Sequence, residues 1–166
     1  EGAWAEVVSG FEYDKAIRNG VPGSQIIFNG PDKREEHLAK AIRNGSMIHI
    51  DHLDELMLVH ELAINAPKRA KVAIRVNMDT GIHPQWDRFG FNYENGEAWD
   101  ALQRIVQTGL ADLVGLHCHI GTFVLSPSAY SKATKALCDL ALRCKSSFGF
   151  APGYLDLGGG FASRNT

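Results

Sequence analysis

Short apolar runs alternate along this chain with longer segments of helical period, and this alternation restricts the fold more than any other feature. A pattern of this kind predicts βαβ units and a parallel sheet. The expected fold class is therefore α/β, as a partial parallel (β/α)8 TIM barrel. The runs expected to form strands are residues 5–8, 25–28, 47–50, 71–77, 113–119 and 154–157. The segments expected to form helices are residues 11–19, 33–44, 53–65, 97–108 and 128–147.

The chain is short for a complete barrel of this class. It has 166 residues, whereas eight strand–helix units typically occupy about 250 residues. A strand is expected as early as residue 5, and few residues follow Gly160. We therefore expect residues 1–166 to form a single partial barrel domain, with flanking strands outside this chain.

Charge, hydropathy and cysteine usage exclude several kinds of partner. The 17 Lys and Arg residues and the 19 Asp and Glu residues give a net charge of -2 without a basic stripe, so no nucleic acid is expected. No apolar run in the sequence approaches the roughly 20 residues of a membrane helix, so no membrane partner is expected. The three cysteines show no CxxC spacing, which argues against a disulfide framework and against a cysteine zinc site. A reducing, cytoplasmic location is the expectation.

Three consecutive glycines, Gly158, Gly159 and Gly160, directly follow the last expected strand. Without Cβ atoms, successive backbone N–H groups can converge on the oxygens of a phosphate. Ligands of parallel α/β folds bind at the carboxyl ends of the strands, which is where this turn is expected to lie. From these residues alone, a backbone phosphate site and a simple tight turn are equally good interpretations.

A second candidate site is the strand-like run that ends in His117, His119 and Thr122. Strand alternation predicts that the two histidines share one face. An imidazole can stack on a heteroaromatic ring, and a threonine hydroxyl can donate to a phosphate oxygen. We expect a structural hydrogen-bonding role for His117 and a functional role for His119. The two glycine-containing segments could then hold one cofactor.

Taken in order, these motifs resemble those of the alanine-racemase-like, fold type III enzymes that use pyridoxal 5'-phosphate (PLP), and within them the diaminopimelate/ornithine/arginine decarboxylase group. The resemblance covers nearly the whole chain. The matching segments are residues 5–10, 27–33, 72–77, 88–91, 119–122 and 155–161.

The resemblance implies that PLP is the cofactor and that the triple glycine, residues 158–160, encloses its phosphate. His119 would stack on the pyridine ring, and Thr122 stands where the family usually has a serine that contacts the phosphate. Arg75 matches an arginine near the ring hydroxyl, so His119 and Arg75 are the candidate catalytic residues. Glu6 aligns where the family usually has an aspartate near the Schiff base, and it completes the candidate cofactor-binding set.

The resemblance also implies an activity for the full-length parent. That activity is decarboxylation, a lyase reaction, of a small-molecule amino acid with a basic or diamino side chain, in a homodimer with a second β domain. The family's Schiff-base lysine would lie on the strand before Glu6, outside this chain, so the chain by itself is not expected to be a complete enzyme.

Other functions fit some of the same residues. An amino-acid racemase or a non-catalytic PLP-binding protein of the same fold would keep the cofactor site. A metal-dependent hydrolase could begin its metal site with His117-x-His119, although the triple glycine would then have no role. We expect no metal site.

Overall fold

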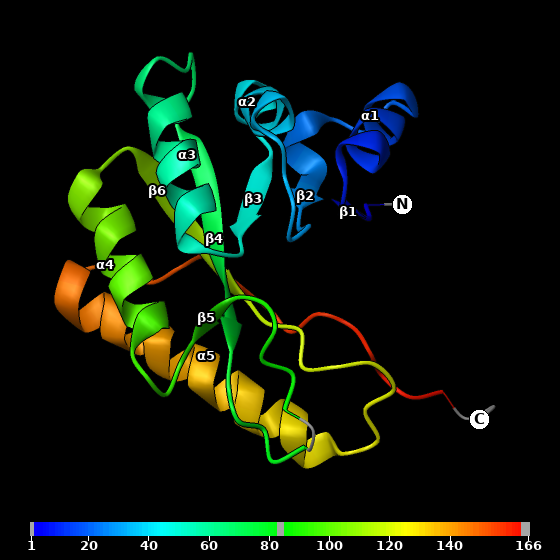
Figure 1. Cartoon of the computed structure of the whole chain (residues 1–166), viewed down its shortest axis with the longest axis vertical. Coiled ribbons are helices and arrows are strands. Elements are labelled where there is room, and N and C mark those ends of the chain that lie inside the picture. The colour runs from blue at the N-terminus through cyan, green and yellow to red at the C-terminus, as the bar shows by residue number, and fades with distance from the viewer. Residues whose placement is uncertain (1, 83–84, 164–166) are drawn as a thin grey trace. The chain divides into compact units, whose positions relative to one another are not determined.

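The computed structural model describes residues 2–82 and 85–163, in which strands and helices alternate as expected (Figure 1). Each expected strand and helix is present, with ends that shift by a few residues. The strands are β1 (Ala5–Val7), β2 (Ile26–Phe28), β3 (Met47–Ile50), β4 (Ala70–Asn77), β5 (Phe91–Asn92), β6 (Ala111–His117) and β7 (Tyr154–Asp156). The helices are α1 (Gly10–Arg18), α2 (Glu35–Asn44), α3 (Leu53–Ile64), α4 (Glu97–Thr108) and α5 (Pro127–Phe148), with a 3-10 turn at Gly23–Gln25.

The chain divides into two compact units. The first comprises Glu1–Ala73 and Arg104–Val114, and the second comprises Ile74–Gln103 and Gly115–Thr166. Strands β4 and β6 contribute to both units, because the boundary falls inside each of them. Among residues 2–82 and 85–163, no helix combines the length and the apolar character that crossing a bilayer would require.

The first unit is built on parallel strands. Ala5 pairs with Ile26 across β1 and β2, and Ile27 pairs with Met47 across β2 and β3. Every residue of β3 is buried, as in a parallel strand that is covered on both faces. The first halves of β4 and then β6 continue the order of this sheet. Large core side chains of the unit are Tyr13, Phe28, Leu38, Ile48 and Leu56.

The ends of two helices in this unit follow local sequence rules. The Ser9 side chain accepts a hydrogen bond from the Glu12 N–H at 3.2 Å and so caps the start of α1. Gly45, at φ 72°, ends α2 in the left-handed conformation that a residue without a Cβ adopts easily. Both signals are local, because each depends on residues a few positions apart in the chain.

The second unit is built on the ends of β4 and β6, with β7 next to β6 and β5 next to β4. Leu116 pairs with Leu155, and Val76 pairs with Phe91, both in parallel register. Helix α5 packs on β7. Its buried face repeats every three or four residues, through Ala129, Ala133, Ala136, Leu137, Leu140 and Cys144. This packing holds β7, the strand that directly precedes the triple glycine.

One sequence-based expectation about this unit is wrong. Residues 113–119 were expected to form one strand, but β6 ends at His117 and His119 lies beyond it. The neighbouring strand β7 ends at Asp156, which pairs with His117, and the glycine turn that follows offers no extended partner. Strand alternation therefore does not place His117 and His119 on one face.

Candidate functional site

The triple glycine forms a turn directly after β7, and its shape is dictated by close backbone contacts. Gly158 and Gly160 have φ values of 66° and 82°. A Cβ at Gly158 would lie 2.6 Å from the Cys118 carbonyl oxygen, and a Cβ at Gly160 would lie 1.9 Å from the Gly121 carbonyl oxygen. A Cβ at Gly159 would meet no atom within 4 Å. The outer two glycines are therefore required by the fold, whereas the middle one faces open space.

Side chains from both neighbouring strand ends hold this turn. The Gly158 N–H donates to Asp156 Oδ1 at 2.8 Å. The Gly159 N–H lies 3.4 Å from His119 Nδ1, which is long for a hydrogen bond. The structure thus brings together the triple glycine and His119, which the sequence singled out separately.

Asp156 links the turn to β6. Its second carboxylate oxygen, Oδ2, lies 3.1 Å from Nδ1 of the buried His117, and its backbone carbonyl accepts the Cys118 N–H at 2.8 Å. His117 thus pairs with Asp156, as a structural histidine would, while His119 lies against the glycine turn. The two histidines meet different partners, which weighs against the His117-x-His119 metal site.

Cys118, between the two histidines, is a buried thiol. Burial, reinforced by the charge of Asp156 and opposed by that of Arg75, raises its pKa to about 12. The thiol is therefore protonated at neutral pH and is a poor nucleophile.

Arg75 lies on β4 and is 8% exposed. Its guanidinium carbon lies 4.9 Å from the centre of the Phe89 ring, a cation–π contact. The loop that carries Phe89 is held against the strand by Asn77, whose amide donates to the carbonyl oxygens of Phe89 and Gly90 at 2.9 Å each. A Cβ at Gly90 would lie 2.7 Å from the Arg75 carbonyl oxygen. Sequence reasoning did not identify these supports, although Asn77 at a strand end and the glycine of Arg-Phe-Gly-Phe were visible signals.

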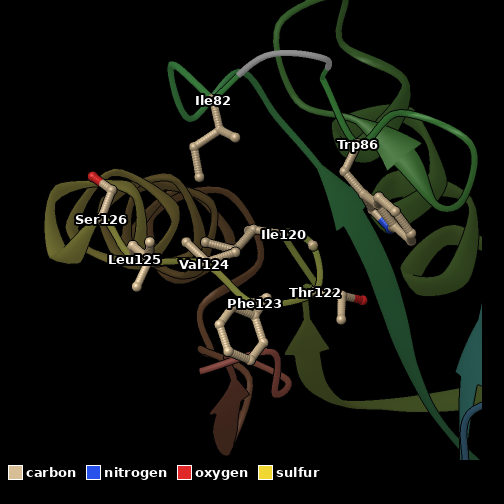
Figure 2. A pocket seen from close by; sticks show the side chains of 9 residues that line it. Ile82, Trp86, Ile120, Thr122, Phe123, Val124, Leu125 and Ser126 are labelled. Atoms are coloured by element: carbon tan, nitrogen blue, oxygen red, sulfur yellow. The ribbon is translucent and has the colours of Figure 1, made fainter. Parts of the chain in front are cut away.

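Thr122 is exposed and lies beside the turn, with its Cα 3.5 Å from the position that a Cβ of Gly160 would occupy. It also borders a pocket of about 450 Å³, whose lining includes Ile82, Trp86, Ile120 and Phe123 (Figure 2). The Trp86 ring meets the His119 ring at 74°, with centroids 6.2 Å apart. His119, Thr122 and the triple glycine thus belong to one local cluster in the second unit.

Glu6, the remaining candidate, belongs to the first unit. It is exposed on β1 and accepts a hydrogen bond from the Asn29 side chain at 2.6 Å. No signal in the sequence indicated this contact between Asn29 and a candidate site residue.

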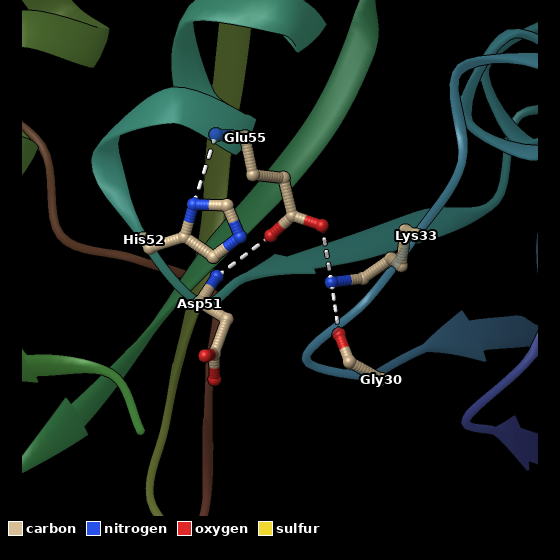
Figure 3. Close-up of polar contacts among 5 residues, drawn as sticks. All are labelled: Gly30, Lys33, Asp51, His52 and Glu55. Carbon is tan, nitrogen blue, oxygen red and sulfur yellow. Dashed lines mark hydrogen bonds and ion pairs between the residues drawn. The ribbon is translucent and has the colours of Figure 1, made fainter. Parts of the chain in front are cut away.

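The first unit also contains a buried ion pair that the sequence did not reveal. Lys33 Nζ lies 2.6 Å from Glu55 Oε1, and the exposed fractions of the two side chains are 0% and 2%. Lys33 also donates to the Gly30 carbonyl, and Glu55 Oε2 accepts the Asp51 N–H at 2.7 Å (Figure 3). Burial raises the pKa of Glu55, against the opposing effect of Lys33. This cluster ties the loop after β2 to the start of α3.

Comparisons with known proteins identify a family for this chain. A family model described as the pyridoxal-binding domain of pyridoxal-dependent decarboxylases matches residues 1–166. The diaminopimelate decarboxylase of Aquifex aeolicus is 33% identical over 172 residues, which cover 98% of this chain and 40% of that protein. The corresponding Bacillus subtilis enzyme is 29% identical and is covered to 40%. The chain thus spans about 40% of the length of these relatives.

Solved structures show the same fold. The diaminopimelate decarboxylase of Methanocaldococcus jannaschii in complex with L-lysine superposes with a TM-score of 0.86 at 29% identity, over 98% of this chain and 40% of that one. The arginine decarboxylase of Paramecium bursaria Chlorella virus bound to agmatine gives a TM-score of 0.80 at 27% identity, over 96% and 42%. The expected α/β class, a partial parallel (β/α)8 barrel, is confirmed.

Proposed function

The chain belongs to the pyridoxal-binding domain family of the pyridoxal-dependent decarboxylases, and we propose that it supplies the phosphate- and ring-binding part of a PLP-dependent amino-acid decarboxylase. The observation that carries this proposal is the open space at Gly159, next to His119. No atom lies within 4 Å of a Cβ built at Gly159. Its N–H makes only a 3.4 Å contact with His119, and a charged phosphate oxygen would be a stronger acceptor for it.

The residues of the second unit fit the phosphate of PLP with divided roles. Gly158 already donates its N–H to Asp156, so its part is to turn the chain. The N–H groups of Gly159 and Gly160 and the exposed hydroxyl of Thr122 would donate to the phosphate. The methyl group of Thr122 restricts its rotamers more than the family's serine would.

Two further side chains would orient the cofactor ring. His119 would stack on the pyridine, with its Nδ1 directed at the glycine turn. Arg75, a permanent cation, would stabilise negative charge on the ring hydroxyl. Bound PLP supplies the electron sink that allows a bond to the substrate α-carbon to break. Glu6 is a weaker candidate, because its carboxylate already accepts the Asn29 amide.

The substrate class and assembly are also part of the proposal. We infer a basic or diamino amino acid, since similar proteins are described as diaminopimelate and arginine decarboxylases, and solved ones were found with L-lysine or agmatine. A Schiff-base lysine outside this chain, a homodimer and a cytoplasmic location belong to the same expectation.

The test uses the full-length protein that contains this chain. PLP is added, the visible absorbance is recorded, and the protein is reduced with borohydride and mapped for a modified lysine. Release of carbon dioxide from diaminopimelate, arginine, ornithine and lysine is then measured. We expect a trapped cofactor and carbon dioxide from at least one substrate. Trapped cofactor with racemised amino acid would instead support the racemase alternative, and the absence of any trapped cofactor would contradict PLP binding.

His119→Ala in that protein isolates the proposed stacking role. We expect weaker PLP retention, with an unfolding midpoint close to that of the unmodified protein, because His119 is half-buried beyond the end of β6 and is not a core residue. Unchanged PLP retention and turnover would remove His119 from the site.

A further inference from the structure

Tyr130, in the second turn of α5, contacts the glycine turn from the side of the helix. Its hydroxyl donates to the Gly159 carbonyl oxygen at 3.1 Å. Its ring also stacks on Phe161, the residue that follows the triple glycine, with centroids 4.5 Å apart and an angle of 17° between the planes. One side chain thus contacts the turn at its middle and at its exit.

The hydroxyl contact has a definite effect on the peptide that it holds. The Gly159 carbonyl and the Gly160 N–H belong to one planar peptide unit, and a trans peptide directs these two groups to opposite sides. When Tyr130 binds the carbonyl, the Gly160 N–H is turned away from Tyr130. The same peptide in a free glycine segment would rotate readily, because glycine has little steric preference.

Neighbouring peptides of the turn are held by other parts of the second unit. The Val124 N–H donates to the Gly160 carbonyl at 2.8 Å, next to the bridge between Val124 and Phe161. The Gly158 N–H is held by Asp156. The peptide between Gly159 and Gly160 is the one whose orientation depends on Tyr130.

Tyr130 is suited to act as a constant donor. Its ring is half-buried between α5 and the turn, and burial raises the pKa of its hydroxyl above the ordinary value. The hydroxyl therefore stays protonated at neutral and mildly alkaline pH. The carbonyl that it contacts can only accept, so the direction of this hydrogen bond is fixed.

We propose that Tyr130 is a positioning residue that pre-orients the Gly160 N–H for the phosphate of the cofactor. This inference rests on the proposed PLP site and deepens it, since it identifies a residue outside the ligand-contacting set that determines how well that site binds phosphate. Orienting a donor before the ligand arrives lowers the ordering cost of binding, and the benefit applies to the phosphate alone.

The test compares PLP with pyridoxal, which lacks the phosphate, in the full-length protein. Tyr130→Phe keeps the ring that stacks on Phe161 and removes only the hydroxyl. We expect the Kd of PLP to rise about three- to tenfold, the loss of one neutral hydrogen bond, and the Kd of pyridoxal to stay unchanged. In the cofactor-free protein, the Gly160 amide should exchange its hydrogen faster.

A matched control removes another tyrosine hydroxyl. The buried Tyr13 hydroxyl pairs with Ser46 Oγ at 2.7 Å in the first unit. Tyr13→Phe is expected to lower the free energy of unfolding without changing the ratio of the two Kd values. Phe161→Leu, which removes the stacked ring and leaves the Tyr130 hydroxyl, should weaken PLP binding in the same phosphate-selective way.

Each outcome has one meaning. Equal losses of PLP and pyridoxal affinity in Tyr130→Phe, or no loss of either, would overturn the positioning role while leaving the PLP site intact. Failure of the unmodified full-length protein to bind PLP would overturn the proposed function itself, before any variant is compared.

Discussion

The two polar clusters of this chain differ in how completely their groups are satisfied. In the first unit, Lys33 and Glu55 are buried and bonded to each other, and both also bond to backbone groups. In the second unit, the glycine turn and Thr122 are half-buried or exposed, and the middle glycine faces open space. Both clusters follow strand ends, where a barrel binds its ligands. The position of a cluster at a strand end therefore does not tell whether the cluster binds a ligand or only stabilises the fold. The two roles differ in whether the polar groups of the cluster already have hydrogen-bond partners within the protein.

The largest effect is expected on the free energy of unfolding, from removing the buried ion pair between Lys33 and Glu55. Lys33→Met leaves Glu55 as a buried carboxylate without its partner charge, which typically costs about 3–5 kcal/mol of unfolding free energy. Urea denaturation of the full-length protein measures the loss, and the ratio of the PLP and pyridoxal affinities should not change.

The control for this variant is Lys40→Met in the same unit. Lys40 pairs with Asp14 at 2.5 Å, but the two side chains are 37% and 43% exposed. Solvent-exposed pairs contribute about 0–1 kcal/mol, so this variant should be close to neutral. If the two substitutions lower the free energy of unfolding equally, the buried Lys33–Glu55 pair does not stabilise the fold more than an exposed pair does, and our inference is wrong.

A smaller effect on folding is expected inside the glycine turn. Gly160→Ala forces a Cβ into the Gly121 carbonyl at a positive φ, and the combined strain should cost about 2–4 kcal/mol. Gly159→Ala should leave the free energy of unfolding unchanged, because its Cβ enters open space, yet it should weaken PLP binding. Stability and affinity measured on both variants separate the glycine required by the fold from the glycine that faces the ligand. A Gly159→Ala variant with normal PLP affinity would argue that this space is not the phosphate site.

A smaller effect than those of the Lys33 and Gly160 variants is expected at Thr122. Thr122→Val removes the hydroxyl while keeping the branched shape, and losing a hydrogen bond to a charged phosphate should weaken PLP about tenfold or more. Thr122→Ser retains the hydroxyl and should bind as well as the unmodified protein. Titration with PLP measures the affinity of both variants. If Thr122→Val and Thr122→Ser bind PLP equally well, the proposed phosphate contact is excluded.

Much of the fold was visible in the sequence because its signals are local. The apolar runs, the helical periods and the caps at Ser9 and Gly45 depend on residues close in the chain. The end of β6 was misjudged because it depends on where β7 ends, a long-range pairing between His117 and Asp156. The same long-range dependence explains why the contacts of Asn77, Lys33 and Tyr130 could not be predicted. Each of these side chains bonds to a segment that is distant in the sequence.

The sequence by itself determined the α/β class and the family resemblance. It also identified Gly158, Gly159, Gly160 and His119 as candidate site residues. It could not assign separate roles to the three glycines, since all three remove a Cβ and look alike in a string of letters. The tertiary structure decided that Gly158 and Gly160 lie against the backbone of residues 118–121 while Gly159 faces open space. The physical reason is that this packing joins segments far apart in the chain, and only the folded sheet brings the ends of β6 and β7 together.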